Sequence, residues 1–151
     1  MRISRFLFFL LLLIGQSGFA KVVVSKDSLV KIIDKANTYW QTTHENPGNP
    51  FWDNAAYHTG NMEAYKVTGN EKYRAYSEKW AVLNEWKGAK GADKSKWKYK
   101  YGETQDHVLF GDWQICFQTY IDLYHLNPDS IKIARAIEVM EYQMSTAAND
   151  Y

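Results

Sequence analysis

The sequence has 151 residues, and its 18 Lys and Arg nearly balance its 17 Asp and Glu, which gives a formal net charge of +1. A near-neutral chain offers no electrostatic basis for nonspecific binding to nucleic acid or to an anionic membrane surface. Cys116 is the single cysteine, so an internal disulfide is excluded, and its place in a helical pattern predicts a buried, small apolar side chain.

The first 20 residues are organised like a cleavable secretory signal. Arg2 and Arg5 precede an apolar run over residues 6–14, and residues 18–20 (Gly-Phe-Ala) give the small-x-small pattern of a cleavage site. The run is shorter than the roughly 18 apolar residues that cross a bilayer, which disfavours the alternative of a membrane anchor. We therefore predict an exported protein, periplasmic or secreted, whose mature chain is residues 21–151 and has no membrane contact after cleavage.

Apolar residues recur at helical spacing along most of the mature chain. A first helix is predicted after Ser25, a favourable N-cap, and a second over residues 54–67, closed by the turn signal Thr68-Gly69-Asn70. Residues 45–50, rich in Asn, Gly and Pro, form the loop between them. The first helix carries a stripe of apolar and aromatic residues: Leu29, Ile32, Ile33, Ala36, Tyr39 and Trp40.

Three further helical segments follow the turn at Gly69. The third predicted helix has one face with Tyr73, Tyr76, Trp80 and Leu83, and a basic, glycine-containing loop over residues 88–100 follows it. The fourth helix is predicted to start near Asp112, and the fifth at Asn127-Pro128, with Asn as N-cap and Pro at the first helical position. The predicted apolar stripe of the fifth helix is Ile131, Ala134, Ile137 and Met140.

No segment predicts a strand except the short alternating stretch 96–101, so the expected fold class is all-α. A weak repeat relates Met62–Tyr65 and the helix after it to Ile121–Tyr124 and its following helix, at an offset of 59 residues. This period exceeds those of tetratricopeptide and armadillo units and suits a toroid of paired helices with its site among the loops at one end. Because no partner helix follows the fifth, we expect a truncated chain.

The aromatic content is the unusual feature, since all 6 Trp and all 11 Tyr lie in the mature chain. Such side chains fill cores, and they also stack on the apolar faces of sugar rings. Among the carboxylates, Asp112 is the best suited to a pocket, because it follows a glycine, starts a predicted helix and is flanked by Trp113. The same position also suits a helix N-cap, so the residue pattern alone leaves both roles open.

Several short motifs resemble glycoside hydrolase families 88 and 105. They are Trp52 followed by Tyr57-His-Thr-Gly60, the stretch from Tyr65 to Tyr73, and Gly111-Asp-Trp-Gln114 followed by residues 118–124. The resemblance implies the first part, about five helices, of an α/α six-hairpin toroid. It implies hydrolysis of oligosaccharides that end in a 4,5-unsaturated uronic acid. An aspartic acid protonates the double bond, water adds to the other carbon, and the hemiketal opens to release the remaining sugar.

The resemblance also assigns roles to residues. Asp112 matches the first of the family's two active-site aspartates, and Tyr57 matches the tyrosine of its Tyr-x-x-Gly motif. Trp52 and Trp113 are candidates for stacking on the sugar, and His58 and His107 for hydrogen bonds to the uronate carboxylate. The second aspartate of the family lies beyond Tyr151, so the mature chain is not expected to catalyse the reaction by itself.

Other function classes remain open from the sequence. A non-catalytic, sugar-binding helical module would use the same aromatics and Asp112, and another α/α-toroid glycosidase would accept intact polysaccharide. A helical-repeat adaptor is disfavoured by the 59-residue spacing. The four histidines lack metal-ligand spacing, and no phosphate-binding glycine loop is present, so we expect neither a metal nor a cofactor.

Overall fold

The computed structural model describes residues 25–44 and 46–146. Their regular structure is five α helices, α2 (Lys26–Thr43), α3 (Trp52–Thr68), α4 (Glu71–Leu83), α5 (Cys116–Leu126) and α6 (Ile131–Thr146), and two 3-10 helices, η1 (Lys94–Lys96) and η2 (Gly111–Trp113). These residues contain no strand, which confirms the all-α prediction. None of the described helices has the length and hydropathy to cross a membrane. The predicted signal, residues 1–20, lies outside the described residues.

The predicted boundaries of the first three helices are largely confirmed. The Ser25 side chain caps α2 by accepting a hydrogen bond of 3.2 Å from the amide of Ser28. Helix α3 begins at Trp52, two residues before the predicted start, and ends at Thr68. Its C-cap is Gly69, whose φ of 69° is the left-handed conformation that glycine adopts without strain. Asn70 then caps α4, so the turn between α3 and α4 is only two residues long.

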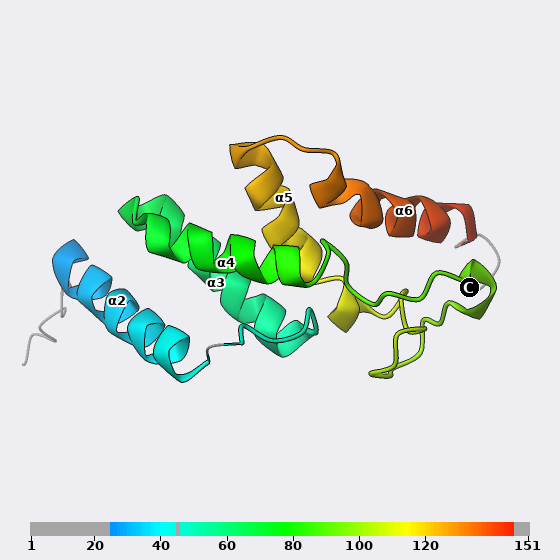
Figure 1. The fold of residues 1–151 in the computed structure, drawn as a ribbon, viewed down its shortest axis with the longest axis horizontal. Coiled ribbons are helices and arrows are strands. Elements are labelled where there is room, and N and C mark those ends of the chain that lie inside the picture. The colour runs from blue at the N-terminus through cyan, green and yellow to red at the C-terminus, as the bar shows by residue number, and fades with distance from the viewer. Residues whose placement is uncertain (1–24, 45, 147–151) are drawn as a thin grey trace, which may run out of the picture.

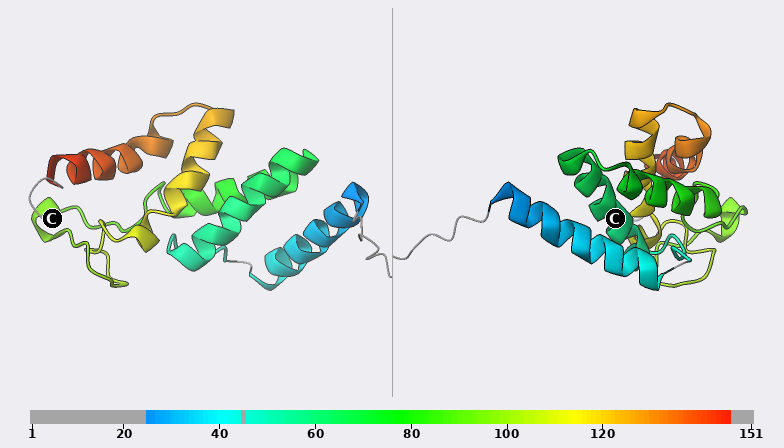
Figure 2. Two further views of the ribbon diagram at one scale, coloured as in Figure 1. Left: turned by 180° about the vertical axis from the view of Figure 1, so that it is seen from behind. Right: turned by 60° about the vertical axis from the view of Figure 1, so that its left-hand side comes forward.

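The helices form an open row of antiparallel hairpins (Figures 1 and 2). Helix α3 pairs with α4, α5 pairs with α6, and α3 packs against α5, while α2 lies along α3 at one end of the row. Thr59 and Thr119 join α3 to α5 through a hydroxyl hydrogen bond of 3.3 Å, and Lys66 on α3 lies 3.1 Å from Asp122 on α5. The repeat unit of 59 residues is therefore one hairpin with the loop before it, as in the first part of an α/α toroid.

The core lies where α3, α4 and α5 meet. Its largest fully buried side chains, Trp80, Tyr73, Tyr120, Met62, Leu123 and His58, come from these three helices. Trp86 and Trp97 extend the core beneath α6 from the long connection between α4 and α5. Aromatic packing therefore accounts for much of the unusual composition.

Two predicted helix starts are wrong. Asp112 lies in η2, where the amides of Trp113 and Gln114 bond three residues back, and the α-helix begins only at Cys116. Helix α6 begins at Ile131 rather than at Asn127-Pro128. The Asp129 carboxylate accepts a hydrogen bond from the Ile131 amide, and Asn127 instead ends α5. In both places a local turn adds residues before the helix, and the apolar period cannot reveal such a turn.

The predicted apolar stripe of the fifth helix is not its buried face. Ile131, Ala134, Ile137 and Met140 are exposed, and the residues that face the core are Lys132, Arg135, Ala136 and Val139. The stripe of α2 is also open in part, since Leu29, Ile32 and Tyr39 are exposed. The row of helices thus has apolar surface on both of its end helices.

Candidate active site at the N-terminal ends of α3 and α5

The N-terminal ends of α3 and α5 meet through two aromatic rings. Phe51, immediately before α3, packs edge-on against Trp113 in η2, with 4.8 Å between the ring centroids. The side chain of Asn49 fixes the approach to α3 by accepting a hydrogen bond of 3.1 Å from the amide of Phe51. The contact brings together two segments about sixty residues apart in the sequence and forms the floor of the candidate site.

Asp112 lies in η2, directly before Trp113 of this floor. It is half-buried, whereas its neighbour Trp113 is only 2% exposed and donates its indole N–H to the carbonyl of Gly102 at 3.0 Å. Trp113 is therefore an anchor for the turn, and its ring has no free face for a sugar. The sequence predicted both residues for the site, but the geometry gives Trp113 a structural place and leaves Asp112 as the accessible group.

His107 also belongs to this region. Its Nδ1 lies 2.6 Å from the carbonyl oxygen of Lys100, and its ring packs so closely on Gly102 that a Cβ there would lie 2.2 Å from the imidazole. Because Gly102 also accepts the hydrogen bond from Trp113, His107 and the turn that carries Asp112 share one contact residue. His107 is half-buried, and it holds the loop over residues 100–107 in place.

Tyr101 is a further candidate residue that the sequence analysis missed. Its ring is 63% exposed, packs edge-on against Phe110 at 5.4 Å, and its hydroxyl donates to Glu103 at 3.0 Å. The hydrogen bond to Glu103 raises the pKa of Tyr101, with further contributions from the Glu103 charge and from Asp112. An exposed aromatic ring near Asp112 offers an apolar surface for one face of a sugar.

Trp52 and Asp53 form the opposite side, at the start of α3. The Trp52 ring is 49% exposed, so it keeps a surface for stacking. Asp53 is exposed and lies 59 residues before Asp112, which gives it the equivalent place in the preceding hairpin. The 59-residue repeat could have identified Asp53 from the sequence. It was missed because an acidic residue also suits the first turn of a helix.

Tyr57 points away from this region and towards α2. Its hydroxyl donates to the Asn37 side chain at 2.7 Å and accepts from Gln41 at 3.4 Å, and its ring stacks on Trp40. It lines a groove of about 580 Å³ between α2 and α3, together with Asn61, whose buried amide has no hydrogen-bond partner among the described residues. The structure therefore does not place Tyr57 beside Asp112.

His58 is a core residue. It has no exposed surface and is sandwiched between Trp80, at 4.1 Å, and Tyr76, at 5.5 Å. Its ring nitrogens lie 3.1 Å from the Ser77 hydroxyl and 3.4 Å from the Pro47 carbonyl. Burial lowers the pKa of His58 to about 3, so the ring is neutral. Its predicted contact with a uronate carboxylate has no support in this placement.

The structure thus brings Asp112 together with His107 and Trp113, and joins them to Trp52 through Phe51. A carboxyl group between aromatic surfaces can give a proton to, or take one from, a sugar that stacks on those surfaces. Residues 25–44 and 46–146 contain no group of three or more His, Cys, Asp or Glu side chains arranged to hold a metal ion.

Comparison with known proteins identifies the class of molecule to which this geometry belongs. The family model of Glycosyl Hydrolase Family 88 matches residues 24–150. A solved structure described as a glycosyl hydrolase of family 88 from Bacteroides vulgatus is 56% identical, with a TM-score of 0.80 over 82% of this chain and 36% of that one. A second, described as a polysaccharide lyase, is 65% identical, with a TM-score of 0.81 over 85% of this chain and 36% of that one.

The chain therefore spans about a third of the length of these solved structures. Among curated proteins, the comparison found no significant match.

Proposed function

Because this chain belongs to glycosyl hydrolase family 88, we propose that it forms the Asp112 side of an active site that removes a 4,5-unsaturated uronic acid from an oligosaccharide. In this reaction a carboxylic acid gives a proton to one carbon of the double bond, and water adds its hydroxyl to the other. The resulting hemiketal opens, and the neighbouring sugar leaves with its glycosidic oxygen. This differs from a two-carboxylate glycosidase, in which the leaving group is displaced directly at the anomeric carbon.

The observation that carries the proposal is the position of Asp112. It is half-buried on η2, next to Trp113, whose ring packs against Phe51 and whose indole N–H is bound by the Gly102 carbonyl. A group that exchanges a proton with a sugar needs such a fixed place, because proton transfer depends on hydrogen-bond distance in the bound complex. Trp52 and Tyr101 would supply the stacking surfaces, and His107 would position the loop between them.

A single optical assay tests the reaction. The protein is incubated with an unsaturated disaccharide of galacturonate or glucuronate, and the ultraviolet absorbance of the conjugated double bond is followed. Hydration destroys this chromophore, so any turnover appears as a fall in absorbance that Asp112→Asn should abolish. The matched control is Asp27→Asn, which changes the same charge on the exposed first turn of α2.

Binding of the disaccharide is measured in parallel by calorimetry. Binding weakened by Asp112→Asn, without turnover, would assign this chain the substrate-holding part of the site and favour the sugar-binding module. If the protein neither binds nor turns over the disaccharide, the proposal is contradicted.

A second candidate is a polysaccharide lyase, favoured by the name of the 65% identical structure. A lyase removes a proton beside the uronate carboxyl group and expels the glycosidic oxygen, which creates a double bond. The same assay with intact polygalacturonate separates the two. A lyase creates double bonds and raises the absorbance, whereas the proposed hydrolase leaves it unchanged, because the intact polymer has no double bond to hydrate.

We also propose that the protein is exported, with cleavage after Ala20. The basic start, the apolar run and the small-x-small site support this. Mass spectrometry of the protein from the periplasm or medium would find Lys21 at the N-terminus, and an intact Met1 on cytoplasmic protein would contradict export.

A further inference from the structure

Residues 85–91 form a short connection between α4 and the rest of the chain, here called the strap. It begins with two consecutive non-glycine residues in the left-handed conformation, Glu85 with φ 56° and Trp86 with φ 57°. This conformation costs roughly 1 kcal/mol or more per residue for non-glycine residues, so the surrounding contacts must hold it. Those contacts show what the strap does.

The strap runs directly against the turn that carries Asp112. At Gly88 an added Cβ would lie 1.9 Å from the carbonyl oxygen of Trp113 and 3.4 Å from Cys116 Sγ. The main chain at position 88 thus lies so close to Trp113 that only glycine fits there. The backbone of η2 therefore lies against the strap, and the Trp113 side chain of η2 packs against the Phe51 ring.

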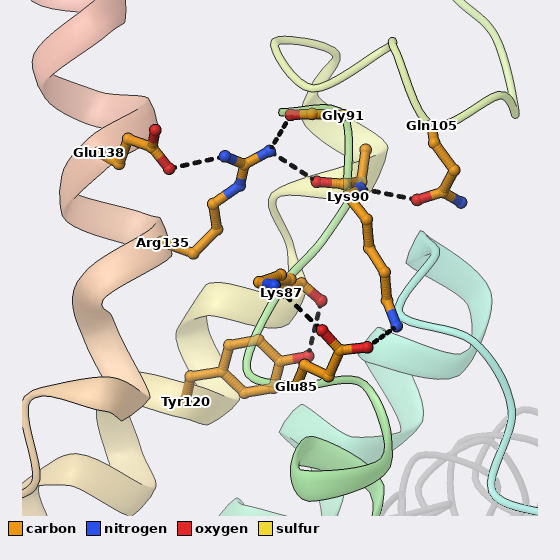
Figure 3. A network of polar contacts seen from close by, with 9 residues as sticks. Glu85, Lys87, Lys90, Gly91, Gln105, Tyr120, Arg135 and Glu138 are labelled. Atoms are coloured by element: carbon orange, nitrogen blue, oxygen red, sulfur yellow. Dashed lines mark hydrogen bonds and ion pairs between the residues drawn. The ribbon is translucent and has the colours of Figure 1, made fainter. Parts of the chain in front are cut away.

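Other elements hold the strap in this position (Figure 3). Tyr120 on α5 donates its hydroxyl to the carbonyl of Lys87 at 3.1 Å, and Gln105 accepts from the amide of Lys90 at 2.7 Å. Glu85 is paired with Lys87 and Lys90, which lower the pKa of its carboxyl group to about 2. These exposed ion pairs contribute little by themselves.

Arg135 on α6 makes the central contact. Its guanidinium donates from Nη2 to the carbonyls of Ala89, at 3.0 Å, and Gly91, at 2.7 Å, and from Nη1 to Glu138 at 2.6 Å. It also lies over the Trp97 ring, 4.7 Å from the centroid, and is only 9% exposed. The planar guanidinium holds these two carbonyls and the Glu138 carboxylate from one rigid group while it stacks on Trp97, and a lysine ammonium does not reproduce that geometry.

We propose that Arg135 and Gly88 are positioning residues for Asp112. Arg135 holds the strap from the α6 side, Gly88 contacts the carbonyl of Trp113, and η2 thereby keeps Asp112 at a fixed place beside Trp113. The role of Asp112 in this chain rests on the function proposed above, whereas the mechanical link from Arg135 to η2 does not.

Hydrogen exchange tests the mechanical link without any ligand. The amide of Gln114, which donates to Gly111 at 2.8 Å, reports η2, and amides in the middle of α3 report the core. Gly88→Ala and Arg135→Lys are each expected to speed exchange at Gln114 about tenfold while the α3 amides keep their rates. Equal acceleration at both places, or none at Gln114, would overturn the proposal.

Two control variants match these changes. Gly60→Ala adds the same methyl group in α3, where no atom lies within 4 Å of the added Cβ. Arg74→Lys exchanges the same side chain on α4, where it pairs with Glu71 and Glu78. Neither is expected to change exchange at Gln114.

A double-mutant cycle tests the link to Asp112. Gly88→Ala is expected to weaken binding of the unsaturated disaccharide about fivefold or more in the wild-type background, and to have no effect once Asp112→Asn is present. A Gly88→Ala effect that is unchanged by Asp112→Asn would show a merely structural role. Loss of Gln114 protection together with no disaccharide binding would keep the mechanical link and reject the proposed function instead.

Discussion

The Phe51 ring meets the Trp113 ring edge-on at 4.8 Å, and this is the contact that joins the first turn of α3 to the turn before α5. Both rings are buried, with exposed fractions of 9% and 2%. Each stands directly beside a site candidate, Phe51 before Trp52 and Trp113 after Asp112. The buried rings therefore fix the distance between the two sides of the site.

Phe51→Ala should destabilise the protein by about 3 kcal/mol, since it removes a buried aromatic side chain and leaves a cavity against Trp113. Urea unfolding followed by tryptophan fluorescence measures this change. Phe51→Leu keeps most of the apolar volume and is expected to cost about half as much. If Phe51→Ala unfolds at the same urea concentration as the wild type, the two rings do not hold α3 and η2 together.

The two glycines of the α3 region should respond to alanine in opposite directions. Gly60 lies inside α3 with free space around an added Cβ, so Gly60→Ala should stabilise by roughly 0.5–1 kcal/mol through helix propensity. Gly69 also has free space, but its φ of 69° disfavours a side chain, so Gly69→Ala should destabilise by about 1 kcal/mol. Thermal unfolding of both variants checks the signs. A stabilising Gly69→Ala would show that the turn between α3 and α4 can change its conformation.

The helical periods were sufficient to predict the fold class and most of the hairpins. The helix boundaries were predicted well where a capping residue lies at the boundary itself, as Ser25, Gly69 and Asn70 do. The failures at Asp112 and Asn127 occurred where a turn precedes the helix. The prediction of the buried face of α6 was wrong for another reason. Lys132 lies over the ring of Trp86 and binds the end of α5, and Arg135 binds carbonyl groups of the strap and lies over Trp97. The apolar period of α6 does not reveal these partners.

The candidate site was only partly predictable from the sequence. Asp112 was predicted from its place between a glycine and Trp113 at a predicted helix start and from the family resemblance, and the structure places His107 in the same region. Tyr57 and His58 were grouped with them by the motif, yet α3 turns Tyr57 to α2 and His58 into the core. Gly88 and Arg135 were missed because their connection to η2 exists only in three dimensions.

Lys132 should be required for the junction of α5 and α6. Its ammonium group donates to the carbonyls of Asn127, at 3.0 Å, and Leu123, at 3.4 Å, at the end of α5, and lies 5.3 Å from the centre of the Trp86 ring. Lys132→Met removes these donors and should cost about 2 kcal/mol of unfolding free energy, measured with urea. Lys31→Met, on the exposed surface of α2, should change it by less than about 0.5 kcal/mol. A Lys132→Met protein as stable as the wild type would mean that apolar packing replaces the cation without loss.

Cys116 should be inert in the folded protein. Its side chain is buried, its thiol lies 3.3 Å from the carbonyl of Trp113, and burial raises the pKa of the thiol to about 12. A disulfide reagent at neutral pH should therefore modify Cys116 only as the protein unfolds, and denaturant should accelerate the reaction strongly. Rapid, complete modification of the native protein would show that the strap and η2 open on their own.

His58 should make the protein less stable in mild acid. Burial holds the pKa of His58 near 3 in the folded protein, whereas in the unfolded chain it is about 6.5. Below pH 6.5 the unfolded state therefore binds a proton that the folded state does not, and the unfolding free energy falls as the pH decreases towards 3. The decrease is at most about 1.4 kcal/mol for each pH unit.

The neighbours of His58 isolate this effect. The described residues that touch its ring are uncharged: Tyr57, Tyr76, Ser77, Trp80 and the Pro47 carbonyl, and burial keeps both tyrosines neutral by raising their pKa values. The carboxylates elsewhere also titrate in acid, so the measurement is the difference in unfolding free energy between wild type and His58→Gln at each pH. This difference should be constant above pH 7 and should shift in favour of the variant from pH 6 down to pH 4. The matched control is His125→Gln, at an exposed position on α5. The unfolding free energy of this variant, plotted against pH, should stay parallel to that of the wild type. Parallel curves for His58→Gln as well would mean that the buried ring accepts a proton without unfolding the helices that enclose it.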